Sequence, residues 1–321
     1  MEQYNWKDHY DVDLREIETT GSFTHYKIDE PGDGDVISCT VFPGIQALYN
    51  DLNLYHCGKI VPRTEDVLEI NYCIGGRYEC EVSSQYCFYA ISGDLSIGNA
   101  GRREAAGSFP TGHFTGLTLF IEPKMVSGRN ASILQDLKID LELIKRMAFQ
   151  DPRRFYIRGK SDIDVVCRQM ISAITDHDLP LLKLKTLELL MKISDPDLIQ
   201  RNNIPIYLSQ KNVQLAKNIR EKISKDLSCH LTLQQLSSEF HASPTAIKTA
   251  FKTVYGETIR EYLKTIRLQE AQRLLRDTDW HILEIAEMVG YSNPGHFAVA
   301  FRERYTMTPS EFRNSIRSKW E

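Results

Sequence analysis

The chain has 321 residues, of which 42% are hydrophobic and 26% are charged, and its formal net charge is −4. The length favours about two domains, and the composition excludes disorder along the whole chain. No apolar stretch reaches the roughly 20 residues of a membrane span, and the first residues lack the pattern of a secretory signal, so we expect a cytoplasmic protein with no membrane partner. Seven cysteines, an odd number, are expected to be reduced thiols.

The charge is unevenly distributed along the chain. From Ile219 to Glu321 there are 15 Lys/Arg and 13 Asp/Glu, whereas residues 1–218 hold 24 Lys/Arg and 30 Asp/Glu. The relatively basic C-terminal third permits contact with nucleic acid but does not establish it.

The first patterned region, from Phe42 to Glu122, has short runs of β-branched and aromatic residues between turn residues. We expect a turn at Gly75-Gly76, with separate strands before and after it. The predicted strands are Asp66–Cys73, Tyr78–Val82, Cys87–Ile91, Leu95–Ile97 and Leu117–Ile121. Strands about ten residues apart with glycine-containing turns predict a small all-β sandwich or barrel.

From about Ser132 the apolar residues recur at helical spacing. They are Leu134, Leu137, Leu141 and Ile144 in one stretch, and Val166, Met170, Ile171 and Ile174 in the next. Leu181–Ile193 is rich enough in leucine for a helix that is buried on more than one side. Ser194–Pro205 is polar and contains Pro196 and Pro205, which predicts a linker and a domain boundary near residue 207.

The C-terminal region carries start and stop signals for seven helices. Capping boxes, in which a hydroxyl and a side chain three residues later satisfy backbone amides reciprocally, are predicted at Thr232/Gln235, Thr258/Glu261 and Thr308/Glu311. An N-cap residue precedes a proline at Ser243-Pro244, Asn293-Pro294 and Thr308-Pro309. Gly256 and Gly290 stand where a helix would end in a left-handed residue.

Two stretches of this region, Leu236–Phe251 and Ile285–Phe301, share one plan. Each has apolar residues four apart, a tight turn, an N-cap before proline and a second helix with two apolar anchors. This is the plan of a helix-turn-helix, whose second helix can enter the major groove of DNA. The anchors that are expected to face the core are Ile247, Phe251, Phe297 and Phe301.

The segment between the two units, Thr258–Arg276, is predicted to be a single helix of 19 residues. At a rise of about 1.5 Å per residue it would be about 28 Å long. Such a spacer can hold two recognition helices about one DNA turn, roughly 34 Å, apart. A helical bundle that binds another protein is the alternative, but two matching units around an intact helix favour DNA.

Residues from about Val213 to Arg313 resemble the DNA-binding domain of AraC/XylS-family transcription regulators. The match is carried by Leu236…Phe240, Ser243-Pro244, Phe251-Lys252, Tyr255-Gly256, Tyr262, Arg267-Leu268, Ala271, Leu274-Leu275, Ile285-Ala286, Val289-Gly290-Tyr291, His296-Phe297, Phe301 and Thr308–Arg313. The resemblance covers about a third of the chain. It implies two helix-turn-helix units that bind double-stranded DNA, joined by a long helix and preceded by a sensor or oligomerisation domain.

Three positions depart from the family pattern. Thr306 stands where glycine is usual, so we expect the turn before Thr308 to differ in backbone geometry. Gly295 replaces a common serine, and His281 replaces a better N-cap residue. We expect the first two changes to alter how the second unit meets DNA.

The resemblance also places the base-facing positions. In the first recognition helix they are Thr245, Lys248 and Thr249, with Lys252 near the phosphate backbone; in the second they are Pro294, Gly295, His296 and Val299. Lys donates to guanine and Thr contacts several bases, whereas the second set is poor in donors. We hypothesise that the first unit supplies most base recognition, and that the second mainly positions the protein through Asn293, Arg302 and helix-terminal amides.

The strand-rich region resembles the cupin-like sensor domain often fused to this DNA-binding domain, at Gly75–Cys80 and Ile91–Leu95. Small barrels often enclose a cavity, so we expect an effector pocket there. Its predicted lining residues are Tyr72, Arg77, Tyr78 and His113.

A metal-dependent cupin enzyme is disfavoured. Catalytic cupins hold metal with a His-x-His pair, a carboxylate and a later histidine, and this region has isolated His56 and His113. Cys73, Cys80 and Cys87 are spaced by seven, which puts neighbours of one strand on opposite faces unless a turn resets the phase, so buried thiols are favoured over a metal cluster. We expect no metal, cofactor or catalytic residue.

Together these features predict an α+β protein. A cupin-like effector-sensing domain with an N-terminal extension is expected at 1–131, a helical dimerisation and linker segment at 132–206, and an AraC-type DNA-binding domain at 207–321. The predicted function is sequence-specific transcription regulation by an effector-responsive homodimer, with RNA polymerase as a partner if the protein is an activator. The alternative is a cupin-type enzyme tethered to a DNA- or protein-binding helical domain.

Overall fold

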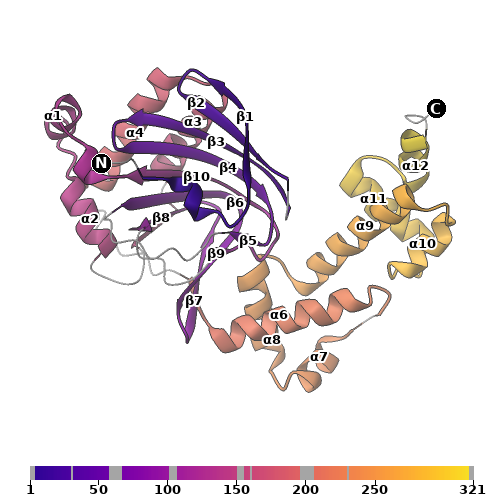
Figure 1. Ribbon diagram of the computed structural model, residues 1–321. Coiled ribbons are helices and arrows are strands. Elements are labelled where there is room, and N and C mark those ends of the chain that lie inside the picture. Colours follow the sequence, from indigo (N-terminus) through magenta and orange to yellow (C-terminus); the bar gives the residue numbers. More distant parts are fainter. Residues whose placement is uncertain are drawn as a thin grey trace. The chain divides into compact units, whose positions relative to one another are not determined.

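The computed structural model (Figure 1) describes residues 4–29, 32–57, 67–100, 107–149, 155–159, 161–195, 206–229 and 231–317. The chain forms two compact units, Met1–Ser209 and Gln210–Glu321. The α+β class predicted from the sequence is confirmed, because strands dominate the first unit and helices the second.

The first unit is built on one antiparallel sheet, which has 12 strands in the described residues. The strands are β1 (Leu14–Thr20), β2 (Phe23–Ile28), β3 (Asp33–Phe42), β4 (Ile45–Asn53), β5 (His56–Cys57), β6 (Leu68–Ser83), β7 (Tyr86–Ile91), β8 (Asp94–Asn99), β9 (Gly107–Ser108), β10 (Phe114–Ile121), β11 (Phe155–Arg158) and β12 (Ile206–Ser209). The main path of hydrogen-bonded neighbours is β1-β2-β3-β4-β10-β6-β7-β12. Strands β8 and β9 also pair with β6, while β11 pairs with β8 and β5 with β9.

The helices of the first unit are η1 (Trp6–His9), η3 (Pro123–Met125), α1 (Arg129–Asp136), α2 (Leu141–Phe149), α3 (Ser161–Thr175) and α4 (Leu179–Ile193). Helices α1 to α4 cover one face of this sheet. Helices α3 and α4 pack against each other and against the central strands (Figure 1). One apolar core lies between sheet and helices, with Ile70 and Leu119 meeting Met170 and Leu189. A second core lies on the opposite face of the sheet, where Phe114 and Phe120 join N-terminal aromatic residues.

The predicted turn at Gly75-Gly76 is wrong, because β6 runs through it as one strand of 16 residues. The ladder between β6 and β10 shifts register here: Gly75 pairs with Thr115, while Cys73 pairs with Gly116. Between Cys73 and Gly75, β6 therefore has one residue with no counterpart on β10. Such an extra residue forms a β-bulge, which bends a strand without ending it. Gly76 has φ +76°, and a Cβ there would lie 1.9 Å from the His113 carbonyl oxygen, so the bend requires glycine.

Other elements of the first unit depart from the sequence pattern. Strands β1, β2 and β3 begin well before Phe42, and β11 and β12 were not predicted. The single helical repeat from Leu134 to Ile144 is divided between α1 and α2, because Lys138 adopts φ 56° between them. Residues 196–205 of the predicted linker lie outside the described residues.

The second unit consists of seven helices in the described residues, as predicted. They are α6 (Gln210–Lys225), α7 (Leu233–Glu239), α8 (Pro244–Tyr255), α9 (Ile259–Asp277), α10 (Ile282–Met288), α11 (Pro294–Tyr305) and α12 (Pro309–Arg317). Helix α6 packs on α8, and α9 contacts α8, α10 and α12. Within the described part of the chain, no helix has the length and apolar content that crossing a lipid bilayer requires.

Candidate nucleic-acid interface

The first helix-turn-helix unit is formed by α7 and α8, and its local signals act as predicted. The Thr232–Gln235 capping box starts α7, and the Ser243 hydroxyl accepts a hydrogen bond from the Ala246 N–H at 3.2 Å to start α8. Both predicted anchors of α8, Ile247 and Phe251, are fully buried. The opposite face of α8 is therefore directed to solvent. Its exposed residues include Thr245, Lys248, Thr249 and Lys252.

The second unit, α10 and α11, repeats this plan with a different surface. The Asn293 side-chain oxygen caps α11, accepting from the Gly295 N–H at 2.8 Å and the His296 N–H at 3.3 Å. The anchors Phe297 and Phe301 are fully buried. The exposed residues of α11 include Pro294, Gly295, His296, Val299 and Arg302, alongside Asn293. Exposure makes these side chains available, and their contact with bases stays a prediction.

The turn after α11 keeps the left-handed geometry despite its threonine. Thr306 has φ 63° and ψ −1°, and its N–H donates to the Arg302 carbonyl oxygen. Gly256 ends α8 with φ 84° and ψ −16°. The expected change in backbone geometry at Thr306 is therefore wrong, since the turn is retained with a β-branched residue in a strained region.

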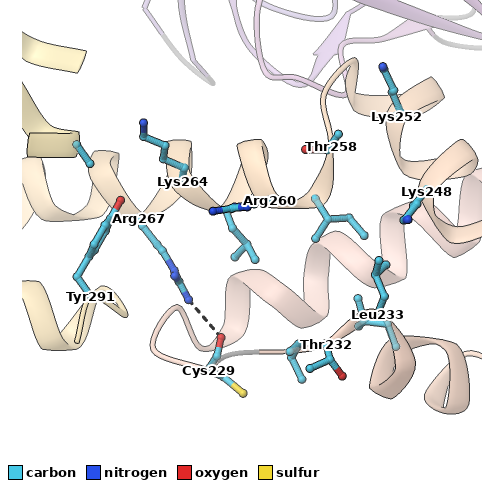
Figure 2. Close-up of a pocket in the computed structure, with 15 residues that line it drawn as sticks. Cys229, Thr232, Leu233, Lys248, Lys252, Thr258, Arg260, Lys264, Arg267 and Tyr291 are labelled. Carbon is cyan, nitrogen blue, oxygen red and sulfur yellow. Dashed lines mark hydrogen bonds between the residues drawn. The ribbon is translucent and has the colours of Figure 1, made fainter. Parts of the chain in front are cut away.

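Helix α9 spans Ile259–Asp277, 19 residues, with the predicted Thr258–Glu261 capping box at its start. In its middle, the Arg267 guanidinium donates to the carbonyl oxygens of Gly290 and Cys229, each at 3.3 Å. Gly290 belongs to the turn of the second unit, and Cys229 lies just before the first. Arg267 thus ties both units to the spacer helix, and Figure 2 shows its hydrogen bond to Cys229. Burial lowers the pKa of its guanidinium from the ordinary value.

Gly290 is required by this arrangement. Its φ is +83°, and a Cβ there would lie 2.4 Å from the Leu227 carbonyl oxygen and 2.7 Å from the Arg267 guanidinium. The left-handed turn predicted at Gly290 is confirmed, and the close approach explains why no side chain fits.

A groove of about 930 Å³ lies beside α9, between the two helix-turn-helix units. Figure 2 shows its basic residues, which come from α8 and from successive turns of α9. We call it the basic groove. It is lined by Cys229, Leu231, Thr232, Leu233, Leu236, Lys248, Lys252, Thr258, Ile259, Arg260, Leu263, Lys264, Arg267, Tyr291 and Ala300. Five of these residues are cationic and none is acidic.

Sequence reasoning identified Lys248 and Lys252 but missed Arg260, Lys264 and Arg267. A signal was present, because these three residues are spaced by four and three positions and share one face of a helix. Basic residues on a helix face are usually only solvated, and the sequence does not show that this face lies next to α8.

The first unit contains a separate, small cavity of about 40 Å³. Its lining residues are Tyr10, Asn50, Leu52, Glu69, Asn71, Cys73, Tyr78, Ala90, Ser96, Phe109, Phe114, Thr118 and Phe120. A chain of hydrogen bonds crosses it, from the Tyr10 hydroxyl to the Asn50 side-chain oxygen, from the Asn50 amide to Thr118 at 3.1 Å, and from Thr118 to Asn71 at 2.7 Å. This volume is large enough for water molecules but not for a ligand, since small-molecule pockets usually have several hundred Å³.

The predicted effector-pocket residues are dispersed around this cavity. Tyr78 lines it. Tyr72 faces the helices instead, and its hydroxyl donates to the Asp164 carboxylate of α3. Burial raises the pKa of that hydroxyl. Arg77 is half-buried, and burial lowers its pKa; the His113 ring contacts Asn53 and Thr115 at 3.3 and 3.2 Å.

The bulge in β6 explains this dispersal. Before the bulge, the odd-numbered residues Glu69, Asn71 and Cys73 face the cavity, whereas after it the even-numbered Tyr78 does. The alternation of side chains between the two faces of the sheet has therefore shifted by one residue. The same reset places Cys73 and Cys80 against one core. Burial raises the pKa of the Cys73 thiol to about 12. Among the described residues, no group of three or more His, Cys, Asp or Glu side chains is arranged to hold a metal ion.

Residues 236–315 match a family model described as a helix-turn-helix domain. The bifunctional transcriptional activator/DNA repair enzyme AdaA of Bacillus subtilis is 35% identical over 95 residues, covering 30% of this chain and 45% of AdaA. The transcriptional activator AggR of Escherichia coli is 30% identical over 114 residues, covering 36% of this chain and 42% of AggR. The C-terminal unit is an AraC-type helix-turn-helix domain.

The AraC-type domain is also similar to solved structures. A probable AraC family transcriptional regulator from Rhodopseudomonas palustris is 28% identical, with a TM-score of 0.30, and the alignment covers 32% of this chain and 97% of that one. The chain spans less than half the length of AdaA and of AggR. The match to the helix-turn-helix family model and the sequence similarity to AdaA and AggR assign the domain, and the activities named for AdaA and AggR belong to those proteins.

Proposed function

We propose that this protein is a sequence-specific, DNA-binding transcription regulator. The observation that carries the proposal is the pair of helix-turn-helix units around a single 19-residue helix, each with its anchors buried and the other face of its second helix exposed. A helix that shows polar side chains beside a braced turn is suited to the major groove. Thr245, Lys248 and Thr249 read bases in the first unit, and Lys252 contacts phosphate.

The second unit contributes positioning more than base recognition. Its exposed Pro294, Gly295 and Val299 offer no side-chain donor, and the Asn293 oxygen already caps α11. The His296 and Arg302 side chains contact the backbone of the duplex. The helix-terminal amides of α11 are not available for this, because the Gly295 and His296 N–H groups donate to the Asn293 side chain and Pro294 has no N–H.

The first unit is the sensor and dimerisation part of this proposal. An effector enters the cavity beside Tyr78, and since that cavity holds only about 40 Å³, binding requires it to widen. Arg77, Tyr72 and His113 contribute only if the surrounding strands move. A ligand of this kind regulates DNA binding by preferring one of two arrangements of the protein.

A second copy of the chain covers the outer face of α3 and α4. Val165 of α3 and Leu184 of α4 are 51% and 65% exposed, and Met191 follows Leu184 by two helical turns. Exposed apolar residues on one helix pair favour a homodimer, which matches paired DNA sites. In this proposal the protein acts in the cytoplasm, catalyses no reaction, and contacts RNA polymerase if it activates.

Selection of bound sequences from random duplex DNA tests the proposal. The full chain is expected to enrich a defined sequence, and alanine at Lys248 or Thr249 to change it. The cupin-type enzyme alternative predicts instead stoichiometric metal in the purified protein and turnover of a small molecule. Failure to enrich any sequence, with the protein folded, would contradict the regulator.

A further inference from the structure

We propose that the basic groove binds the sugar-phosphate backbone of the duplex between the two major-groove segments, so that α9 is a DNA-contacting element as well as a spacer. This inference rests on the proposed function. It adds Arg260 and Lys264 to the interface as phosphate-contacting residues.

The charge of the groove supports a polyanion. Arg260, Lys264 and Arg267 lie on one face of α9, and Lys248 and Lys252 lie one turn apart on α8. All five line the same groove, and no carboxylate does. Phosphate contacts supply most of the affinity of proteins for DNA, and they are made mainly by Lys and Arg.

The ion pairs and hydrogen bonds of the five basic side chains show which of them are available to bind phosphate. In the described part of the chain, no ion pair engages Lys248, Lys252 or Arg260. Lys264 pairs with Glu303 at 2.8 Å, but the two side chains are 51% and 61% exposed. Exposed pairs contribute little free energy, so a phosphate can replace Glu303. Arg267 is already committed to two carbonyl oxygens.

The apolar residues on the floor of the groove favour a nucleic-acid backbone over free inorganic ions as the occupant. Leu233, Leu236, Ile259, Leu263 and Ala300 line it, all apolar. A DNA strand alternates charged phosphates with deoxyribose rings, which have an apolar surface. One strand can therefore contact the cationic side chains and the apolar floor of the groove at the same time. The position of the groove, between the two recognition helices, is where the backbone must cross from one major-groove segment to the next.

Salt dependence of binding tests the inference on the full chain, with a random-sequence duplex and the selected duplex as probes. The logarithm of the binding constant falls linearly with the logarithm of salt concentration, by about 0.9 per phosphate contact. The double variant Arg260→Gln/Lys264→Gln is expected to lower that slope by about 1.8 on both duplexes. Sequence preference stays unchanged, because phosphate contacts carry no sequence information.

The matched control is Arg273→Gln/Arg276→Gln, which removes two cations from the same helix outside the groove. Its slope is expected to equal that of the unchanged protein. Arg260→Lys/Lys264→Arg keeps both charges and is expected to keep the slope. If the double glutamine variant does not fold, the single variants R260Q and K264Q are each expected to lower the slope by about 0.9.

A slope for R260Q/K264Q equal to that of the control pair overturns the inference, and an acidic protein partner then becomes the occupant to test. That result leaves the proposed function intact as long as the unchanged protein binds DNA. Absence of DNA binding by the unchanged, folded protein would instead refute the proposed function, so the two failures are distinguishable.

Discussion

The two helix-turn-helix units have one internal plan and two different surfaces. Both bury an anchor pair four residues apart, and both begin the second helix with a capped proline. On the outside, α8 shows Lys248 and Thr249, whereas α11 shows Gly295 and Val299. The two units therefore share the requirements of the core, while their exposed positions differ in chemistry.

The strongest test of the shared plan removes an anchor from each unit. Phe251→Ala and Phe301→Ala are each expected to cost about 3–5 kcal/mol of unfolding free energy, because both side chains are fully buried among other aromatic rings. Urea unfolding of the full chain measures this loss. Val299→Ala, at a residue 59% exposed, serves as the control and should change stability by less than about 0.5 kcal/mol. A small loss of unfolding free energy at only one of the two phenylalanines would show that the anchors of the two units do not have equivalent roles.

The divergent surfaces predict unequal roles in DNA binding. Lys248→Ala and Thr249→Ala are each expected to weaken binding to the selected sequence by about 1–3 kcal/mol and to relax base preference. His296→Ala and Val299→Ala should change affinity less, and preference hardly at all. Equilibrium titration with the selected duplex and single-base variants measures both. Greater relaxation from the second pair would reverse the assignment.

The helix ends provide a smaller contrast. Gly256→Thr is expected to destabilise the chain by about 1–2 kcal/mol, because a branched residue is strained at φ 84°. Thr306→Gly should stabilise it by less than about 1 kcal/mol, since glycine adopts φ 63° freely but loses more conformational entropy on folding. Thermal unfolding checks the two signs. Stabilisation by G256T would show that the turn after α8 tolerates a side chain.

The smallest effect concerns the acidic capping boxes. Hydrogen bonds from Thr258 and Thr308 hold the pKa of the Glu261 and Glu311 carboxyls below the usual value. A carboxyl whose pKa is lower in the folded than in the unfolded protein stabilises the fold at pH values above the unfolded-state pKa. This stabilisation is lost as the pH falls through the lower pKa of the folded state. Glu261→Gln is expected to flatten the fall of thermal stability between about pH 5 and pH 3. The box at Thr232 uses the neutral Gln235, so Gln235→Ala should leave that pH dependence unchanged.

The sequence was informative where structure depends on neighbours along the chain. Capping boxes, anchors and the ends of α8 and α9 follow from residues within a few positions, and each was predicted. The bulge at Gly75-Gly76 was not, because it depends on the strand that crosses it near His113. For the same reason the prediction that Tyr72 lines the cavity does not follow from local sequence: its side chain lies on the opposite face of β6, toward α3.

The candidate site divides in the same way. Thr245, Lys248 and Thr249 were found from their position in a recognisable motif, and their exposure agrees with that position. Arg260 and Lys264 acquire meaning only when α9 lies beside α8, which is tertiary information. The hydrogen bonds of Arg267 to Cys229 and Gly290 join residues 38 and 23 positions apart, beyond any local pattern.

The most direct test varies the distance between the two halves of the selected DNA site. Because α9 is a continuous helix that holds both units, the full chain should bind best when the half-sites are one helical turn, about 10–10.5 base pairs, apart. Inserting about five base pairs turns the second half-site to the opposite side of the duplex and should lower affinity at least tenfold. Equal affinity for both spacings would mean that the two units do not engage adjacent major-groove segments together.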